Sequence, residues 1–315
     1  MVVSITWFHQ PIATSLLPVA TIIIPVATYH FDLAQRAVAS AEAQSVSVEV
    51  VVIEDQQTQG AGWARNQGLA TASAPFVVFL DADDELDALF VEKCVIQWSQ
   101  RQPSLMYLYT DWRVNDTKDE IRYANDDDGS IFQRGMFHII TTVLPTRAAI
   151  AVGGFDEGLP TLEDEDFYLK IGTLGFCPVR VPEALVRYHI KDGHSATNSD
   201  NGQQQTLIDN MHRLFFERYG RFRDMACNCK QPKVSANNLP TNPPQEGFVI
   251  AAAMYTHTRK PGPVSKIVYN RVGMGELLWV HPEDAAMRPD WWHVLADPAS
   301  INPDVNQVME LMRNG

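Results

Sequence analysis

Basic residues and cysteines are both scarce in this chain. Lysine and arginine number 25 against 38 aspartates and glutamates, which gives a formal net charge of −13. This balance excludes a broad basic face, and with it binding to duplex nucleic acid or to an anionic membrane surface. The four cysteines lack the paired spacing of a zinc site and form no secretory framework, so we expect a reduced, cytoplasmic setting.

Long hydrophobic runs are also absent. No Asp, Glu, Lys or Arg occurs before Asp32, but Pro11, Pro18 and Pro25 interrupt this uncharged stretch. No run reaches the ~18 apolar residues that a membrane span needs, and no basic segment of a signal peptide is present. We therefore expect no membrane span, and a surface extension or apolar flap at residues 1–18.

The 315 residues exceed what one core usually serves, so we expect about two domains. Residues 231–246 are rich in Pro, Asn, Thr, Ser and Gln, a composition typical of an extended linker. It would separate a main domain at 19–230 from a small β-rich module at 247–315. Strand-like runs in that module lie at 248–255, 266–269 and 277–281, before the pair Trp291-Trp292. This pair is expected to fill a small core; sugar or protein binding is the alternative.

The main domain begins with alternating strands and helices. The β-branched residues 21–24 predict a buried strand that Pro25 stops, because proline lacks the backbone donor. The alternation predicts an α/β fold with a mostly parallel sheet, which binds ligands beyond the carboxyl ends of its strands. The next predicted elements are a helix at 33–44, a strand at 47–53, a helix at 62–71 and a strand at 75–80.

Five further elements are predicted downstream. They are helices at 87–99, 163–173 and 206–219, and strands at 105–110 and 179–189. Residues 111–131 resemble a hairpin around the acidic tip at 125–129, which we interpret as a solvated turn.

The predicted strand at 75–80 leads directly into Asp81, Asp83 and Asp84. Carboxylates so close repel one another unless a cation lies among them. Their oxygens suit Mg²⁺ or Mn²⁺ that carries a diphosphate. The alternative is an acidic turn that caps the helix beginning near Asp87, and this motif alone does not decide between them.

Five stretches in order resemble the family 2 glycosyltransferases, GT-A fold enzymes that transfer a sugar from a nucleotide diphosphate to an acceptor. The matching stretches are residues 21–26, 51–55, 64–70, 79–84, and 153–157 with 163–170. The resemblance covers about residues 20–195. It implies a metal-dependent, inverting enzyme of the hexosyltransferase type.

The resemblance also implies where a donor would bind. Asp55, with Glu54 beside it, would accept the N3–H of uracil, which favours a UDP-sugar, and backbone near Pro25 and Ala27 would line the nucleotide. Arg65 would approach the base or phosphate.

An ion pair of Arg65 with Asp55 or Asp83 is the alternative, and the two roles can coexist.

For the metal, the resemblance implies Asp83 as the most direct ligand, with Asp81 binding ribose or the metal shell and Ala82 in the same donor segment. His189 would complete the shell of Mn²⁺ or Mg²⁺, and His194 is the alternative.

On the acceptor side, the resemblance implies Asp164 as the general base that removes the acceptor hydroxyl proton, and Glu163 as an acceptor-binding residue. Because the pair repeats as Glu165-Asp166, the register stays open by two residues. Acids that complement the dipole of a helix's first turn explain one or two of these four carboxylates.

Two other functions compete with this interpretation. A nucleotidyltransferase also needs a strand-end metal carboxylate, but it expects a Gly-rich loop with Lys or Arg, and residues 26–30 contain no glycine or lysine. A non-catalytic nucleotide-sugar-binding or phage-like structural protein would act through residues 247–315, which could bind a protein partner. The acceptor could be a glycan, a lipid-linked saccharide, a protein or a modified nucleotide.

Overall fold

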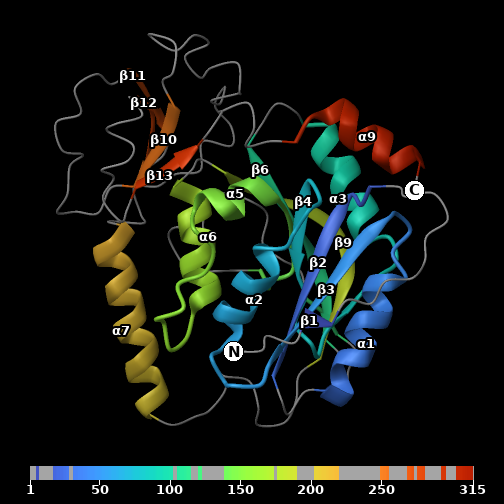
Figure 1. The fold of residues 1–315 in the computed structure, drawn as a ribbon. Coiled ribbons are helices and arrows are strands. Elements are labelled where there is room, and N and C mark those ends of the chain that lie inside the picture. Colours follow the sequence, from blue (N-terminus) through green and yellow to red (C-terminus); the bar gives the residue numbers. More distant parts are fainter. Residues whose placement is uncertain are drawn as a thin grey trace.

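The computed structural model has an α/β architecture in which a mixed sheet lies between two groups of helices (Figure 1). The predicted fold class is thereby confirmed at this level. The acidic tip at 125–129, His194 and the linker at 231–246 lie outside the described residues. The described residues are 5–6, 17–27, 31–101, 105–114, 120–122, 138–173, 176–189, 202–219, 249–254, 268–272, 275–280, 292–295 and 303–314.

The first half follows the predicted order. Its elements are β2 (Ala20–Ala27), α1 (Phe31–Glu42), β3 (Val48–Asp55), α2 (Ala61–Leu69) and β4 (Phe76–Phe79). Strand β2 lies between β3 and β4 and pairs in parallel with both. The connections after β2 and β4 therefore leave in opposite directions. Such a topological switch point creates a crevice beyond the carboxyl ends of the two strands, where α/β sheets bind ligands.

The sheet is mixed rather than mostly parallel. Beyond β4 come β8 (Thr142–Pro145), β6 (Met106–Val114), β9 (Cys177–Tyr188) and β5 (Glu85–Leu86). Strand β8 is antiparallel to both β4 and β6, and β6 is parallel to β9. Consequently β2, β3, β4, β6 and β9 all end at the same edge. Short strands β1 (Ile5–Thr6) and β7 (Glu120–Arg122) pair antiparallel with β3 and β6.

Strand β2 does not stop at Pro25, as the sequence predicted, but runs through it to Ala27. The carbonyl of Ile23 accepts a hydrogen bond from Leu80, so Ile23 faces β4. Alternation along the strand places the proline nitrogen on that same side, beyond the last pair with β4, Ile23 with Phe79. Proline has no backbone N–H, but at this position no residue of β4 is paired with it, so no hydrogen bond of the sheet is lost. On the other side of β2, the pairing with β3 continues to Ala27.

Within the predicted hairpin at 111–131, the structure describes two strands. Strands β6 and β7 pair antiparallel, from Trp112 with Arg122 to Val114 with Glu120. The interpretation of the acidic tip at 125–129 as a solvated turn stays a prediction.

Two cores cover the two faces of the sheet. Ile23 packs into the core formed with α2, α5 (Thr146–Ala151), α6 (Glu163–Thr173) and α7 (Gly202–Tyr219). Ile22 and Ile24 pack into the other, with α1, α3 (Phe90–Ser99) and α9 (Val305–Asn314). This alternation is the two-residue period of a strand buried on both faces.

Helix α2 lies directly against β2 because Gly68 has no side chain. A Cβ atom at this position would lie 2.4 Å from Ile23 Cγ2, well inside van der Waals contact. The glycine of the 64–70 motif therefore sets how closely the helix carrying Arg65 approaches the sheet.

A second sheet contains β10 (Val249–Met254), β11 (Val268–Val272), β12 (Gly275–Val280) and β13 (Trp292–Leu295), in the order β11-β12-β10-β13. All its pairs are antiparallel. The sequence did not predict α9, whose fully buried Val308 lies in the core with α1 and α3. The boundaries of the predicted module stay a prediction.

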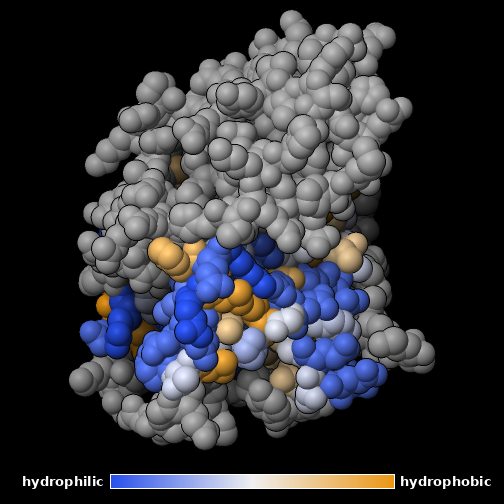
Figure 2. All heavy atoms as spheres, turned by 90° about the vertical axis from the view of Figure 1, so that its left-hand side faces the viewer, coloured by the Kyte–Doolittle hydropathy of each residue, from blue (hydrophilic) through white to orange (hydrophobic). Residues whose placement is uncertain are grey.

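The side of the molecule with α7 is mainly hydrophilic over its described part. Figure 2 shows hydrophilic side chains around a smaller group of hydrophobic ones on this face. Helices that cover a sheet are expected to turn their polar sides outward in this way.

Candidate active site

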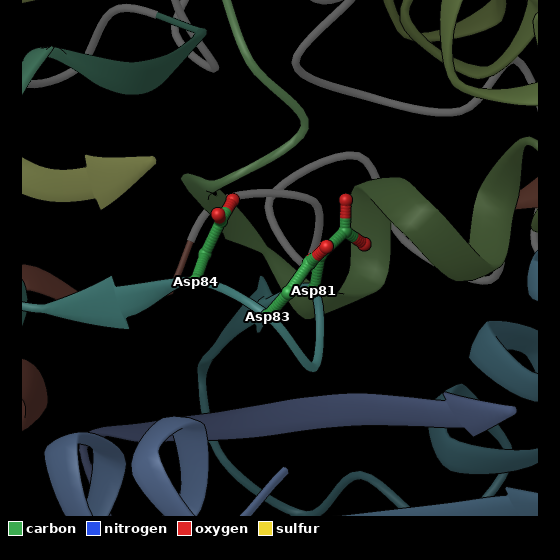
Figure 3. A group of neighbouring side chains, drawn as sticks. All are labelled: Asp81, Asp83 and Asp84. Carbon is green, nitrogen blue, oxygen red and sulfur yellow. The ribbon is translucent and has the colours of Figure 1, made fainter. Parts of the chain in front are cut away.

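Three carboxylates follow β4 at the shared edge of the sheet. One oxygen each from Asp81, Asp83 and Asp84 lies within 4.8 Å of the others (Figure 3). Asp81 and Asp83 are partly exposed, whereas Asp84 is only 1 % exposed. Ala82, between the first two, is buried. The loop therefore holds three acidic side chains together, as the sequence predicted.

Asp84 provides the test of whether a cation fits here. Its Oδ1 accepts a 3.0 Å hydrogen bond from the backbone N–H of His189, but its buried Oδ2 has no hydrogen-bond partner. Burial, followed by the negative charge of Asp81, raises the pKa of Asp84 well above its usual range. A buried, half-satisfied carboxyl group beside two others is stabilised as an anion only by a cation, so the donor set fits a hard divalent ion.

His189 reaches this loop through its backbone. Its ring Nε2 lies 2.7 Å from Glu85 Oε1, on the short strand that follows the acidic loop. Among the described residues, the acidic cluster contains Asp84 rather than His189. Ligation by His189 thus stays a prediction, and Asp84 is the residue that sequence reasoning left without a role. The run of three acids in four residues was its signal.

Arg65 connects the acidic loop to the start of α6. Its Nη2 donates to Asp81 Oδ1 and its Nη1 to Glu163 Oε1, each at 2.8 Å. The side chain is 5 % exposed. Burial opposes its charge, but Asp81 and Glu163 outweigh burial and raise the pKa of the guanidinium. The alternative for Arg65, an ion pair with Asp55 or Asp83, was right about the kind of contact but wrong about the partners, which are Asp81 and Glu163.

Asn66, the residue after Arg65 in α2, binds the backbone of Phe155, whose ring contacts Arg65. Asn66 Oδ1 accepts from Phe155 N at 2.8 Å, and its Nδ2 donates to Phe155 O at 3.0 Å. The Phe155 ring centroid lies 5.2 Å from Arg65 Cζ. A Cβ at Gly154, whose φ is +69°, would lie 2.3 Å from Asn66 Oδ1. The 64–70 and 153–157 motifs therefore form one unit beneath the guanidinium.

Glu163 and Asp164 begin α6 after a strained residue, Leu162, with φ of +58°. Non-glycine residues rarely adopt this conformation, and it is a feature of functional sites. Burial and then the charge of Glu163 raise the pKa of Asp164 to about 6, against the opposing charge of Arg65. Asp164 Oδ1 accepts from the backbone N–H of Glu165 at 2.8 Å. Asp164 is thus a carboxylate that titrates near neutral pH.

Glu165 and Asp166, which repeat the acidic pair, do not bind Arg65 but have partners in α7. Asp166 is fully buried, and its Oδ1 accepts from Tyr219 Oη at 2.5 Å and from Arg218 Nη1 at 3.0 Å. Glu165 Oε2 lies 3.4 Å from His212 Nε2. Both residues therefore bind α6 to α7, and the geometry favours Glu163-Asp164 as the pair that faces Arg65.

Asp55 closes the loop between β3 and α2. Its two carboxylate oxygens accept from the backbone N–H groups of Gln59 at 2.9 Å and Gly60 at 2.7 Å. The carboxylate that is predicted to read the base therefore has a structural role in this loop. Glu54 beside it is partly exposed, and Ala27 ends β2 opposite Asp55. The carboxyl ends of β2, β3 and β4, which the predicted donor-site residues follow, lie at one edge of the sheet.

The geometry agrees with a comparison against known families. The sequence model of the family described as Glycosyl transferase family 2 matches residues 21–155. This part of the chain is therefore similar to that family. The match contains the strand-end carboxylates, Arg65 and Phe155, whereas the α6 acids lie beyond it. The role of Asp164 must therefore be argued from its own surroundings rather than from this match.

Curated relatives of the chain are themselves uncharacterized glycosyltransferases. One from Haemophilus influenzae is 24 % identical over 196 residues, which cover 59 % of this chain and 66 % of that protein. One from Rickettsia felis is 24 % identical over 229 residues, covering 60 % of this chain and 38 % of that protein. The chain thus spans just under two thirds of the first and little more than a third of the second.

Solved structures similar to the chain include S. aureus TarS. The match to TarS 1–349 in complex with UDP-GlcNAc has a TM-score of 0.46 and 15 % identity, covering 62 % of this chain and 72 % of that one. For a longer TarS structure the TM-score is 0.44 and the identity 16 %, covering 65 % of this chain and 45 % of that one. Separately, no helix among the described residues is long and apolar enough to cross a membrane.

Proposed function

We propose that this protein is a metal-dependent, inverting glycosyltransferase of the hexosyltransferase type that uses a UDP-sugar. One observation carries the proposal: Arg65 binds Asp81 of the acidic loop and Glu163 of α6 at once. The carboxylates suited to a donor's cation and the carboxylates suited to an acceptor thereby share one charged site. A glycosyltransferase needs these two groups of carboxylates close together, because the donor and the acceptor must be in contact for the sugar to be transferred.

On the donor side, Asp81, Asp83 and Asp84 would hold Mn²⁺ or Mg²⁺. A divalent ion bound there supplies Lewis-acid neutralisation of the diphosphate that leaves. Asp55, at the end of β3, would accept the N3–H of uracil while its oxygens keep the loop closed. Backbone at Pro25 and Ala27 would line the nucleotide at the switch point of the sheet.

On the acceptor side, Asp164 is the general base. Its pKa of about 6 leaves it ionised at neutral pH, yet basic enough to accept the proton of a hydroxyl group as that oxygen attacks the anomeric carbon. Attack on the face opposite the leaving diphosphate inverts the configuration. Glu163, oriented by Arg65, would hold the acceptor by accepting a hydrogen bond from a second hydroxyl group.

The test is donor hydrolysis and transfer in the presence of Mn²⁺. The full chain is incubated with a panel of UDP- and GDP-sugars, and nucleoside diphosphate release is measured with and without EDTA. Release that requires metal supports the proposal, and no release from any donor contradicts it. Asp164→Asn should abolish transfer while the thermal unfolding curve stays cooperative.

Three further expectations belong to this proposal. The acceptor is a glycan, a lipid-linked saccharide or a protein, the 247–315 segment positions it or binds an assembly partner, and the enzyme works in the cytoplasm. A pull-down with residues 247–302 deleted and α9 retained, compared with the full chain, tests the second expectation.

A further inference from the structure

Arg218, near the end of α7, binds two carboxylates through one nitrogen. Its Nη1 lies 2.7 Å from Asp156 Oδ2 and 3.0 Å from Asp166 Oδ1. The Asp166 side chain is only 1 % exposed, and a buried carboxylate is stable as an anion only with a cation or donors beside it. Asp156 lies in the connection between α5 and α6. Arg218 therefore joins this connection to α6, and the buried Asp166 fixes where the guanidinium lies.

Each of these two carboxylates is next in sequence to an aromatic ring. Phe155 precedes Asp156, and Phe167 follows Asp166. The two rings are stacked, with their centroids 4.2 Å apart and 13° between their planes. Because Arg218 binds the residue beside each ring, it determines how the Phe155 ring lies on the Phe167 ring.

The Phe155 ring in turn contacts the cation of the candidate active site. Its centroid lies 5.2 Å from Arg65 Cζ, a distance at which a guanidinium is attracted to an aromatic ring. The backbone of Phe155 is also bound by Asn66, the residue after Arg65. The position of this ring therefore affects how the Arg65 guanidinium is directed toward Asp81 and Glu163.

We propose that Arg218 is a positioning residue: it holds the Phe155 ring in place and, through this ring, orients Arg65 between Asp81 and Glu163. The inference rests on the proposed function, because it gives the arrangement of these carboxylates a role in sugar transfer. The sequence patterns did not identify Arg218, since α7 lies beyond the stretches that resemble the family.

The first experiment compares the steady-state kinetics of Arg218→Gln and Arg218→Lys with a UDP-sugar in Mn²⁺. Loss of the cation should lower kcat by roughly 10-fold and change the donor KM less, because small displacements of catalytic groups slow the reaction. Lysine should restore most of the rate, since a single ammonium nitrogen can replace Nη1 between the two carboxylates. An unchanged kcat in Arg218→Gln, or a loss that lysine does not restore, would overturn the inference.

A double-mutant cycle with Arg65→Lys tests whether Arg218 acts through Arg65. If it does, Arg218→Gln should lower kcat much less in the Arg65→Lys background than in the wild type. A purely structural role predicts that the two losses multiply, and that result would contradict the proposal.

Two other variants of α7 serve as controls. Arg213→Gln makes the same substitution at an exposed arginine that donates to Asn210 Oδ1, and it should match the wild type. Tyr219→Phe removes a contact to Asp166 and leaves the Asp156 ion pair in place. It should lower the melting temperature and leave kcat unchanged.

Amide hydrogen exchange separates this inference from the proposed function. The backbone N–H of Phe155 donates to Asn66 Oδ1 at 2.8 Å, so its exchange should become faster in Arg218→Gln and not in Arg213→Gln. A wild type that turns over no UDP-sugar contradicts the enzymatic function, but faster exchange at Phe155 would still support the positioning role. Equal exchange at Phe155 in wild type and Arg218→Gln would overturn it, whether or not the wild type is active.

Discussion

Arg65 Nη1 donates a 2.8 Å hydrogen bond to Glu163 Oε1 across 98 residues of sequence. The same guanidinium donates to Asp81 through its other terminal nitrogen, while its buried Nε has no partner. Only a planar, forked cation can bind two carboxylates in this way. The distance between the acidic loop and α6 is therefore fixed by one side chain, which itself rests on Phe155.

Arg65→Lys should separate the two halves of the site. A lysine keeps the charge but binds one carboxylate at a time, so we expect kcat to fall ~10- to 100-fold with a smaller change in the donor KM. Steady-state kinetics and thermal unfolding, measured together, check this. Arg147→Lys, outside the site, serves as the control and should match the wild type. An Arg65→Lys enzyme with unchanged kcat would contradict the bridging role.

The rate should depend on the ionisation of Asp164. Because its pKa is raised to about 6, kcat/KM should fall as the pH drops through about 6. The raised pKa also means that the folded protein disfavours the ionised carboxylate. Asp164→Asn should therefore melt at a higher temperature than the wild type, with a gap that opens as the pH rises from about 4 to about 6. An acid limb near pH 4 would exclude Asp164 as the base.

Asp84→Asn should weaken the metal site and preserve the fold. Asparagine keeps an oxygen for the backbone N–H of His189 but removes the charge of the unpartnered Oδ2. We expect Mn²⁺ affinity to fall ~10- to 100-fold by calorimetry. Asp87→Asn is the control, because Asp87 is exposed and bonded to Leu89 N. A variant that binds Mn²⁺ like the wild type would remove Asp84 from the ligand set.

Tyr219→Phe should destabilise the protein without affecting catalysis. The lost hydroxyl donates to buried Asp166, and leaving that acceptor with one partner fewer costs about 1–3 kcal/mol of unfolding free energy. Urea unfolding measures the loss, and kcat at low temperature should be unchanged. A large fall in kcat at unchanged stability would instead return Asp166 to the list of candidate bases.

The sequence was most informative where a local pattern determines the structure. Residues 20–80 follow the predicted order because β-branched runs and apolar periodicity specify buried strands and covering helices. The helix at Glu163–Thr173 has the predicted bounds. Strand β8 and helix α5 were missed, since residues 142–151 form a short apolar run with neither a cap nor a clear period.

For the site, the sequence predicted residue types and not partners. Three acids within four residues at a strand end predict a cluster of carboxylates, and the structure brings Asp81, Asp83 and Asp84 together. The partner of Arg65 depends on how α6 packs against α2, a tertiary contact that no local pattern encodes. The same holds for Asp84, which accepts a hydrogen bond from His189 because β5 pairs with β9. Its place in the acidic motif was predictable, but this contact was not.

The burial of Val308 shows which core helix α9 belongs to. Helix α7 ends in one core of the main sheet at Tyr219, and α9 packs into the other. The core of the main sheet thus includes a side chain that follows the second sheet in the sequence. A variant that lacks the second sheet must therefore keep α9, because removing this helix would take a buried side chain out of the main core.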